Sequence, residues 1–467
     1  MVPNPITQLE DFEVHLEFNK KIQKCEIMCG ESTRIYNKKI MKTDIISKFI
    51  LILGMIILSS CSSGNSVISK LTTNSKSALE KPYVILISLD GFRWDYIERF
   101  NPPNLSQFIN NGVKAEALIP SFPSKTYPNH YTIATGMYPD HHGIVGNSFY
   151  NYKKNLTYEI RNREMVEDGT YYGGSPIWVQ ADKANLVSAS YFFVGTEASI
   201  QGIRPTYYYN YNGSVKNSAR VQQTLNWLSL PAKKRPHLIT LYFSDMDDVG
   251  HKYGPNNNEE LKKALFDLDR DLGVLFEETK ATELPINIIV VSDHGMAPIS
   301  ASNYIPIEDI KNDSLFLAIN NGSIVNIHLK KNVQLDSVFQ YLKQRENKFK
   351  VYKTENTPGF ETPPKSKDWG AIQIIPDYGY YFSTIKGIQA KKNSPNKTFG
   401  VHGYDPIYKD MHGVFYANGP AFKKGVELAS VKNIHVFPLI CEILALEIPK
   451  NIDGELKQME IVLEKNE

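Results

Sequence analysis

The sequence predicts an α/β fold: a mostly parallel sheet covered by helices on both faces, with a smaller inserted α+β subdomain. Three continuous apolar runs have the length of buried strands, at Tyr83–Leu89, 236–245 and 286–295. These runs lack the apolar-polar alternation of a half-exposed strand, and helical patterns lie between them. Both features are typical of a parallel sheet that is buried on both faces.

Helical periodicity and helix-start signals place the helices. An amphipathic pattern spans 259–280, a shorter one spans 104–111, and a helix is expected over 126–136. The segment from about 300 to 400 differs, because it is rich in Pro, Lys and Asn in stretches such as "TPGFETPPKSKDWG". We expect this segment to be the inserted subdomain, or a lid on the main fold.

Size and charge limit the classes of function. The chain has 467 residues, of which 42% are hydrophobic, so it can bury a large core. Its 52 lysines and arginines nearly balance 50 aspartates and glutamates, which leaves a formal net charge of +2. Such a chain has no strong overall electrostatic field, so we expect no nucleic-acid polymer as a partner. An anionic substrate must then be held by charged or polar groups within its binding site.

The segment 41–60 has the parts of an export signal. Met41 and basic residues precede the apolar run "FILILGMIIL", and small residues lead from it to Cys61. The ending "LSSC" resembles the lipobox of bacterial lipoproteins, in which the cysteine becomes the lipid-modified first residue of the mature protein. A signal anchor is the alternative, but ten apolar residues are fewer than the ~20 that a spanning helix needs.

This interpretation divides the chain into four parts. Residues 1–40 have no signal character, so we expect translation to start at Met41 and 1–40 to be a mis-assigned extension. A signal peptide then spans 41–60, a flexible Ser/Asn/Lys/Thr-rich tether spans 61–81, and the folded domain spans 82–467. The protein is expected to be exported and anchored to a bacterial membrane through Cys61, facing the periplasm or the cell exterior.

Acids and histidines gather where the predicted strands end. The acids at these strand ends are Asp90, Asp247 and Asp293. The histidines near them are His251, His294 and His402. Parallel strands meet at one edge of a sheet, and imidazoles with carboxylates but no thiolates suit zinc or a similar ion in a hydrolytic site. The set therefore predicts a two-metal centre, although each piece alone is explained as a turn, a helix-surface pair or a loop.

Thr126 is a candidate nucleophile. It follows a proline-bounded loop and begins a predicted helix in "PSFPSKTYPNHYTIATGMYPDHHGIVGN". A neighbouring cation stabilises an alkoxide at neutral pH, and the start of a helix offers free N–H groups to an anion. The alternative is that Thr126 only caps the helix through its side chain.

Several long motifs in order resemble the nucleotide pyrophosphatase/phosphodiesterase (type I phosphodiesterase) family of the alkaline phosphatase superfamily. The resemblance runs from about residue 83 to about residue 446, and the motifs are specific. They include "DGFRWDY", "FPSKTYPNHYTIATGMYPDHHGIVGN", "YNGSV", "RPHLITLYFSDMDDVGHKYGP", "VVSDHGM", "HGYD" and "MHGVFYANGPAF". The resemblance implies an alkaline-phosphatase-like sheet and a hydrolase that converts nucleotides and related diesters to nucleoside 5'-monophosphates.

The resemblance also implies two Zn²⁺ ions and a role for each matching residue. One zinc would be held by Asp247, His251 and His402, and the other by Asp90, Asp293, His294 and the Thr126 oxygen. Thr126 would attack phosphorus and form a threonyl-phosphate ester, which a zinc-bound hydroxide hydrolyses. Asn147 would donate its side-chain amide to a phosphate oxygen, as an oxyanion-hole donor does.

Aromatic residues at matching places hold the base in nucleotide-cleaving relatives. Here they are Tyr127, Tyr211 and Tyr242, which we expect to contact the substrate by stacking. Packing or surface tyrosines are the alternative in a chain with 27 of them. No Cys/Ser-x-Pro-x-Arg site of a sulfatase is present. A phosphodiesterase of choline or lysophospholipid head groups stays open, and a non-catalytic ligand-binding lipoprotein is a remote alternative.

Overall fold

The computed structural model describes residues 71–464. The expected extension 1–40, the signal peptide 41–60, Cys61 and residues 62–70 of the tether lie outside the described residues. The rest of the expected tether, 71–81, is packed on the fold, because Asn74 and Ala78 are buried and Asn74 accepts a hydrogen bond from the Val187 N–H. The folded part therefore begins before the predicted residue 82. Within 71–464, no helix combines the length and the apolar content that crossing a membrane requires.

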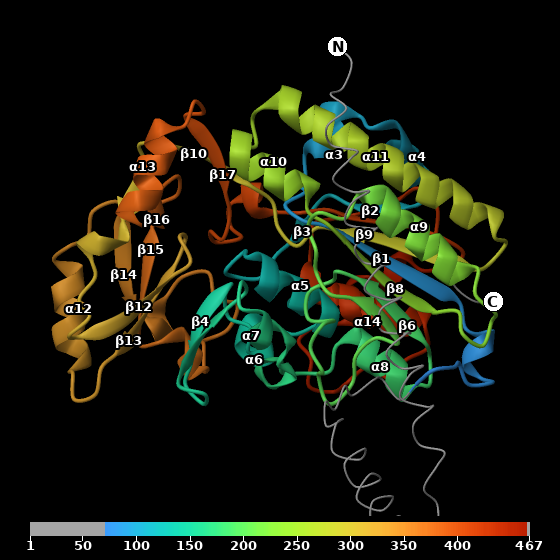
Figure 1. Cartoon of the computed structure of the whole chain (residues 1–467), viewed down its shortest axis with the longest axis horizontal. Coiled ribbons are helices and arrows are strands. Elements are labelled where there is room, and N and C mark those ends of the chain that lie inside the picture. Colours follow the sequence, from blue (N-terminus) through green and yellow to red (C-terminus); the bar gives the residue numbers. More distant parts are fainter. Residues whose placement is uncertain (1–70, 465–467) are drawn as a thin grey trace, which may run out of the picture. The chain divides into compact units, whose positions relative to one another are not determined.

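An eight-stranded sheet forms the centre of the fold (Figure 1). The strand order is β19-β2-β18-β9-β1-β8-β6-β7. Only β18 runs antiparallel to its neighbours in this sheet, and the other adjacent pairs are parallel. The strands are β1 (Tyr83–Leu89), β2 (Val113–Ala115), β6 (Ser188–Tyr191), β7 (Tyr207–Tyr209), β8 (Leu238–Phe243), β9 (Ile286–Val291), β18 (Phe415–Asn418) and β19 (Val426–Leu428).

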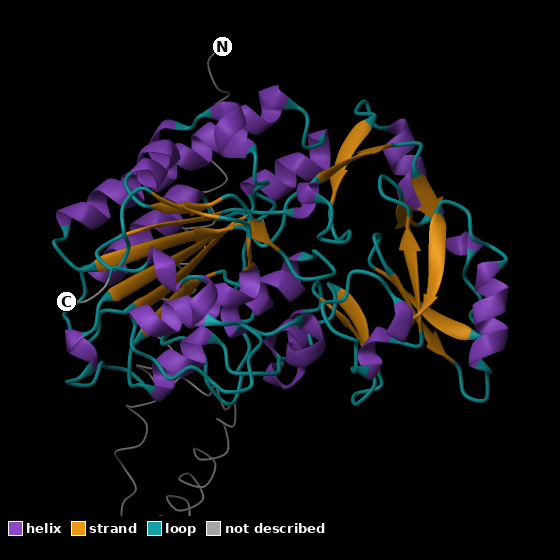
Figure 2. Cartoon of the chain, turned by 180° about the vertical axis from the view of Figure 1, so that it is seen from behind, coloured by secondary structure: helices purple, strands orange, loops and turns teal. Residues whose placement is uncertain are grey.

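Helices cover both faces of this sheet, as Figure 2 shows. Along β1, Ile85 and Ile87 pack in the same core as α4 (Pro103–Asn110), α9 (Asn217–Leu228) and α11 (Asn258–Ala281). Val84 and Leu86 point to the opposite face, into the core formed with α5 (Thr126–Thr135), α8 (Ile177–Lys183) and α14 (Val436–Ile443). Successive strand residues alternate between faces, so a strand that is apolar throughout needs a cover on each. The predicted fold class and the three predicted helices are confirmed.

A smaller α+β unit lies between β10 (Ala297–Ser300) and β17 (Thr398–Val401), which pair antiparallel. We call residues 301–397 the inserted subdomain. Its antiparallel sheet has the order β12-β13-β15-β14 and a core of its own with α12. Its elements are β11 (Tyr304–Pro306), β12 (Phe316–Asn320), β13 (Val325–Leu329), α12 (Leu335–Lys343), β14 (Phe349–Lys353), β15 (Ile372–Pro376), β16 (Tyr381–Ser383) and α13 (Ile385–Asn393).

Short elements connect these parts. They are α3 (Tyr96–Phe100), β3 (Leu118–Ile119), α6 (Pro139–His142), β4 (Ser148–Asn151), β5 (Leu156–Glu159), α7 (Arg163–Glu167), α10 (Asp245–Tyr253) and β20 (Val431–Lys432).

Candidate active site

The central strands β1, β8 and β9 end level with one another. Leu89 of β1 pairs with Phe243 of β8, and Ser88 pairs with Val291 of β9. The residues that follow these strands therefore meet at one edge of the sheet, which is where open α/β sheets bind ligands. The six acids and histidines among the predicted metal ligands lie at this edge.

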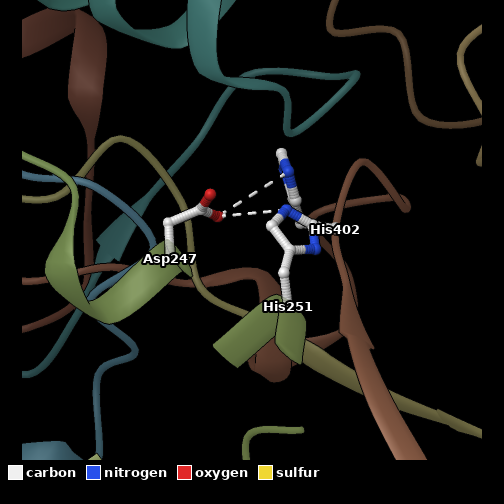
Figure 3. A group of neighbouring side chains, drawn as sticks. All are labelled: Asp247, His251 and His402. Carbon is white, nitrogen blue, oxygen red and sulfur yellow. Dashed lines mark ion pairs between the residues drawn. The ribbon is translucent and has the colours of Figure 1, made fainter. Parts of the chain in front are cut away.

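Asp247, His251 and His402 form the first triad (Figure 3). Asp247 and His251 lie one turn apart on α10, so their side chains share a face of the helix. His402 comes from the loop after β17, and Figure 3 shows the Asp247 carboxylate turned toward both imidazoles. Asp247 Oδ1 lies 3.3 Å from His251 Nε2 and 3.9 Å from His402 Nε2.

Asp90, Asp293 and His294 form the second triad, and each is at most 2% exposed. His294 Nε2 lies 3.4 Å from Asp90 Oδ1 and 3.1 Å from Asp293 Oδ2. Asp293 and His294 lie just past the end of β9, where adjacent side chains are free to turn the same way. The His294 ring also stacks on His402 at 3.6 Å between centroids, so the two triads are contiguous.

Gly91 allows the two triads to approach each other. Its backbone has φ = +63°, and a Cβ there would lie 2.9 Å from Asp247 Cα. A side chain at this position would be strained by the left-handed backbone and would push Asp247 away. The glycine after Asp90 thus provides the sharp turn and also the room for Asp247.

Each histidine of the two triads donates its Nδ1–H to a backbone carbonyl. The acceptors are Gly400 O for His251 (2.8 Å), Gly295 O for His294 (2.8 Å) and Ser124 O for His402 (2.9 Å). A carbonyl only accepts, so these bonds fix the tautomer and leave Nε2 as the lone-pair nitrogen. In all three residues Nε2 faces a carboxylate of the cluster, which is the arrangement that metal-binding histidines use.

The charges of the site fit divalent cations. Burial raises the pKa of the Asp90 and Asp247 carboxyls, and the neighbouring Asp293 raises both further. Burial also lowers the pKa of His294 and His402 well below the ordinary value, so both imidazoles stay neutral. Oxygens of Asp90, Asp247 and Asp293 are buried without a hydrogen-bond donor. Crowded carboxylates with free oxygens, beside neutral imidazoles, are compensated when cations bind between them.

Thr126 lies beside the second triad, at the first position of α5. Its Oγ1 is 3.3 Å from His294 Nε2. The residue before it, Lys125, occupies the N-cap position and makes no side-chain cap. The alternative that Thr126 serves only as a side-chain cap is therefore wrong, and its hydroxyl faces the second candidate metal triad.

Asn147 is held against the start of α5. Its Oδ1 accepts the Tyr127 N–H at 3.0 Å. Since the oxygen is occupied, the amide NH₂ of Asn147 is the group left to meet a substrate. The structure thus brings Asn147 next to Thr126, as the resemblance implied.

The three predicted substrate tyrosines differ in exposure. Tyr211 is 46% exposed and packs edge-on against Phe192 at 5.3 Å. Tyr127 is partly buried against the core beneath α5. Tyr242 is only 9% exposed, and its hydroxyl donates to Asp90 Oδ2 at 2.5 Å. Base stacking by these residues stays a prediction, and the Tyr242 hydroxyl also holds Asp90, a candidate metal ligand.

Two buried residues of the site were not anticipated from the sequence. His130 lies one turn after Thr126 on α5, and its Nδ1 is 2.9 Å from Thr126 O and 3.2 Å from Asp293 Oδ2. Lys125 is 4% exposed, with its ammonium directed at the His402 carbonyl. The i, i+4 spacing of Thr126 and His130 is a signal that could have pointed to the histidine.

Comparisons with known proteins identify the family to which the chain is similar. The sequence pattern of the type I phosphodiesterase/nucleotide pyrophosphatase family matches residues 84–405. The chain is 35% identical over 392 residues to venom phosphodiesterase 2 of Crotalus adamanteus, covering 81% of this chain and 47% of that protein. It is 32% identical over 403 residues to ectonucleotide pyrophosphatase/phosphodiesterase family member 1 of Mus musculus, covering 84% and 44%. The chain thus spans about half the length of these curated relatives.

Solved structures show the same likeness. Murine ectonucleotide pyrophosphatase/phosphodiesterase 5 superposes with a TM-score of 0.75 at 29% identity, covering 82% of this chain and all of that one. An inactive variant of the murine protein has been solved in complex with AMP and superposes equally well. On the family pattern, the relatives and the two candidate metal triads together, the chain belongs to the type I phosphodiesterase/nucleotide pyrophosphatase family.

Proposed function

We propose that the protein is a two-zinc hydrolase that cleaves phosphodiester or pyrophosphate bonds of nucleotides and releases nucleoside 5'-monophosphates. The observation that carries the proposal is the position of Thr126, whose hydroxyl is 3.3 Å from His294 Nε2 at contiguous metal triads. Carboxylate oxygens and neutral imidazole nitrogens are ligands that zinc prefers. Zinc is therefore the proposed cofactor, with one ion at each triad.

The chain's own residues divide the reaction between them. Bound cations would stabilise the Thr126 alkoxide and neutralise charge on the phosphate. Thr126 Oγ1 attacks phosphorus, the P–O bond to the leaving group breaks, and a threonyl-phosphate ester forms. The proton that the Thr126 hydroxyl loses ends on the released alcohol or phosphate. Asn147 donates its amide to a non-bridging oxygen, where charge grows in the transition state. Water then attacks the ester, and its proton restores the Thr126 hydroxyl.

A nucleotide is the proposed substrate. Relatives of this chain are named for phosphodiesterase and nucleotide pyrophosphatase activity, and a structural relative binds AMP. Tyr211 presents an exposed ring, which a nucleobase can stack on whatever its identity. Tyr127 and Tyr242 are proposed as further contacts of the nucleoside.

The experiment compares two chromogenic diesters on the purified protein with zinc. We expect faster turnover of p-nitrophenyl thymidine 5'-monophosphate than of p-nitrophenyl phosphorylcholine, and the reverse order would favour the head-group phosphodiesterase. Thr126→Ala should abolish turnover while zinc content stays near that of the wild type. A Thr126→Ala protein with wild-type activity would refute the threonine mechanism. A zinc-loaded wild type without activity would favour the non-catalytic binding protein.

We also propose that the protein is exported and anchored by a lipid on Cys61. The proposal is supported by the sequence pattern around 41–61 alone. Replacement of Cys61 by Ser should move the protein from the membrane fraction to the soluble fraction of its host. Unchanged membrane association would contradict the anchor.

A further inference from the structure

Lys125, the residue before the proposed nucleophile, is buried and reaches into the inserted subdomain. Its side chain is 4% exposed, and its ammonium donates to the hydroxyl of Tyr381 at 2.6 Å. It also donates to His402 O at 2.9 Å. Burial of an ammonium group costs free energy unless hydrogen-bond acceptors surround it, and these two bonds offset that cost.

Tyr381 links Lys125 to Asn321, a second residue of the inserted subdomain. Its hydroxyl accepts from Lys125 and donates to Asn321 O at 3.2 Å. Asn321 lies in the turn between β12 and β13, and its side chain pairs with both backbone groups of Ser148. Ser148 N–H donates to Asn321 Oδ1 at 3.0 Å, and Asn321 Nδ2 donates to Ser148 O at 2.8 Å.

These bonds and the short chain segments between them form a closed ring that includes Thr126 and Asn147. Ser148 follows Asn147, Asn147 Oδ1 accepts from Tyr127 N–H, and Tyr127 is two residues from Lys125. We infer that the inserted subdomain fixes Asn147 relative to Thr126 through this ring, with Tyr381 and Asn321 as positioning residues. The inference rests on the proposed function, since it assigns these residues to the same reaction.

Two glycines leave room for side chains of the ring. Gly322, with φ = +81°, lies so close to Tyr381 that a Cβ there would be 1.9 Å from the ring. Gly403, with φ = +106°, similarly faces the Lys125 stem, where a Cβ would be 2.4 Å from Cε. Both close approaches need glycine. Contacts this tight fit the supporting role that we infer for the inserted subdomain.

The ring explains how a remote residue can act on rate. In-line attack requires the nucleophile and the oxyanion donor to be held within a fraction of an ångström, and a 1 Å error can cost about 100-fold. Loss of Tyr381 or Asn321 opens the ring. Of the ring's hydrogen bonds, only the one from Tyr127 N–H to Asn147 Oδ1 would then hold the Asn147 loop to α5. We therefore expect loss of either residue to lower kcat roughly 10- to 100-fold, with KM changed less than about twofold.

The test uses Tyr381→Phe, Asn321→Ala and their double variant in the zinc-loaded full chain, with p-nitrophenyl thymidine 5'-monophosphate. Both single variants should lower kcat while two zinc ions per chain are retained. The double variant should lower kcat no further than the more impaired of the two single variants does, because both substitutions break the same ring. Tyr304→Phe is the matched control, since Tyr304 pairs with Tyr381 in the register of β11 and β16 but is not part of the ring. It should behave as the wild type.

Three outcomes would overturn the inference: wild-type kcat in Tyr381→Phe, loss of zinc with kcat, or single effects that multiply in the double variant. Hydrogen exchange gives a readout that needs no activity. Tyr381→Phe should raise exchange at the Tyr127 and Ser148 amides about tenfold or more, and unchanged exchange would refute the ring. An inactive wild type would refute the proposed function, whereas the exchange result would still decide the ring.

Discussion

Tyr242→Phe separates two roles that the sequence and the structure suggest for one residue. The Tyr242 hydroxyl donates to Asp90 Oδ2 at 2.5 Å, and the ring is almost fully buried. A hydrogen bond to a charged group contributes about 1.5–3 kcal/mol. Since a tenfold change in affinity corresponds to about 1.4 kcal/mol, the substitution should weaken zinc binding at the second triad roughly 10- to 150-fold.

The assay is a zinc titration against a competing chelator, followed by kinetics at saturating zinc. Phe keeps the ring, whose centroid lies 5.3 Å from that of His130 and 6.1 Å from that of Tyr211. Kinetics at saturating zinc should therefore match the wild type. Tyr416→Phe is the control, because Tyr416 is buried on β18 of the same sheet and does not bond a metal ligand. Unchanged zinc affinity with a raised KM would refute the reasoning, since the hydroxyl would then serve the substrate.

Three further predictions concern Asp90, Gly91 and Glu361. Asp90→Ala should lower zinc stoichiometry from two to one per chain and abolish activity, and elemental analysis that still finds two would contradict it. Gly91→Ala should lower the free energy of unfolding, measured in urea, by about 2–4 kcal/mol, because the new side chain strains the backbone and contacts Asp247. Gly379→Ala is the control, since Gly379 has φ = +83° but open space around it, and it should lower the free energy of unfolding by only about 1–2 kcal/mol. Burial raises the pKa of Glu361 to about 7 from 4.5, so unfolding releases a proton in that window and stability falls as pH rises through it. Glu361→Gln should therefore raise the free energy of unfolding by roughly 1–3 kcal/mol at pH 8 and leave it unchanged near pH 4. Equal free energies of unfolding for variant and wild type at pH 8 would count against this.

The buried centre of the fold was predictable because its signal is local. Strand β1 matches the predicted run residue for residue, and α11 extends the predicted 259–280 by one residue at each end. The outer strands were not predictable. β2 and β19 have three residues each, and β2 is held by β18, some 300 positions away in sequence. Pairing of that kind depends on tertiary closure, which no short window of sequence contains.

The acids and histidines of the two candidate metal triads could be brought together from residue type and strand ends, whereas the residues that support them could not. Tyr242 is an example, because its place beside Asp90 depends on how β1 and β8 pair. Tyr242 lies opposite Ser88, and Ser88 is two residues before Asp90. Side chains two apart share a face of a strand, so the β1–β8 register brings the tyrosine hydroxyl to the carboxylate. Lys125 and Asn321 are polar residues in loops, and their roles depend on contacts with partners more than 150 residues away.

The site is thus held by two frameworks, and they should fail separately. The metal ligands of the second triad follow rigid strand ends, and Tyr242, on the same sheet, orients one of them. Thr126 and Asn147 belong to a helix start and a loop, and the inserted subdomain ties these together through Tyr381. Tyr242→Phe should therefore change zinc affinity and leave kcat at saturating zinc intact, whereas Tyr381→Phe should lower kcat and leave zinc bound. If either substitution changed both quantities, binding of metal and positioning of the nucleophile would depend on one shared framework.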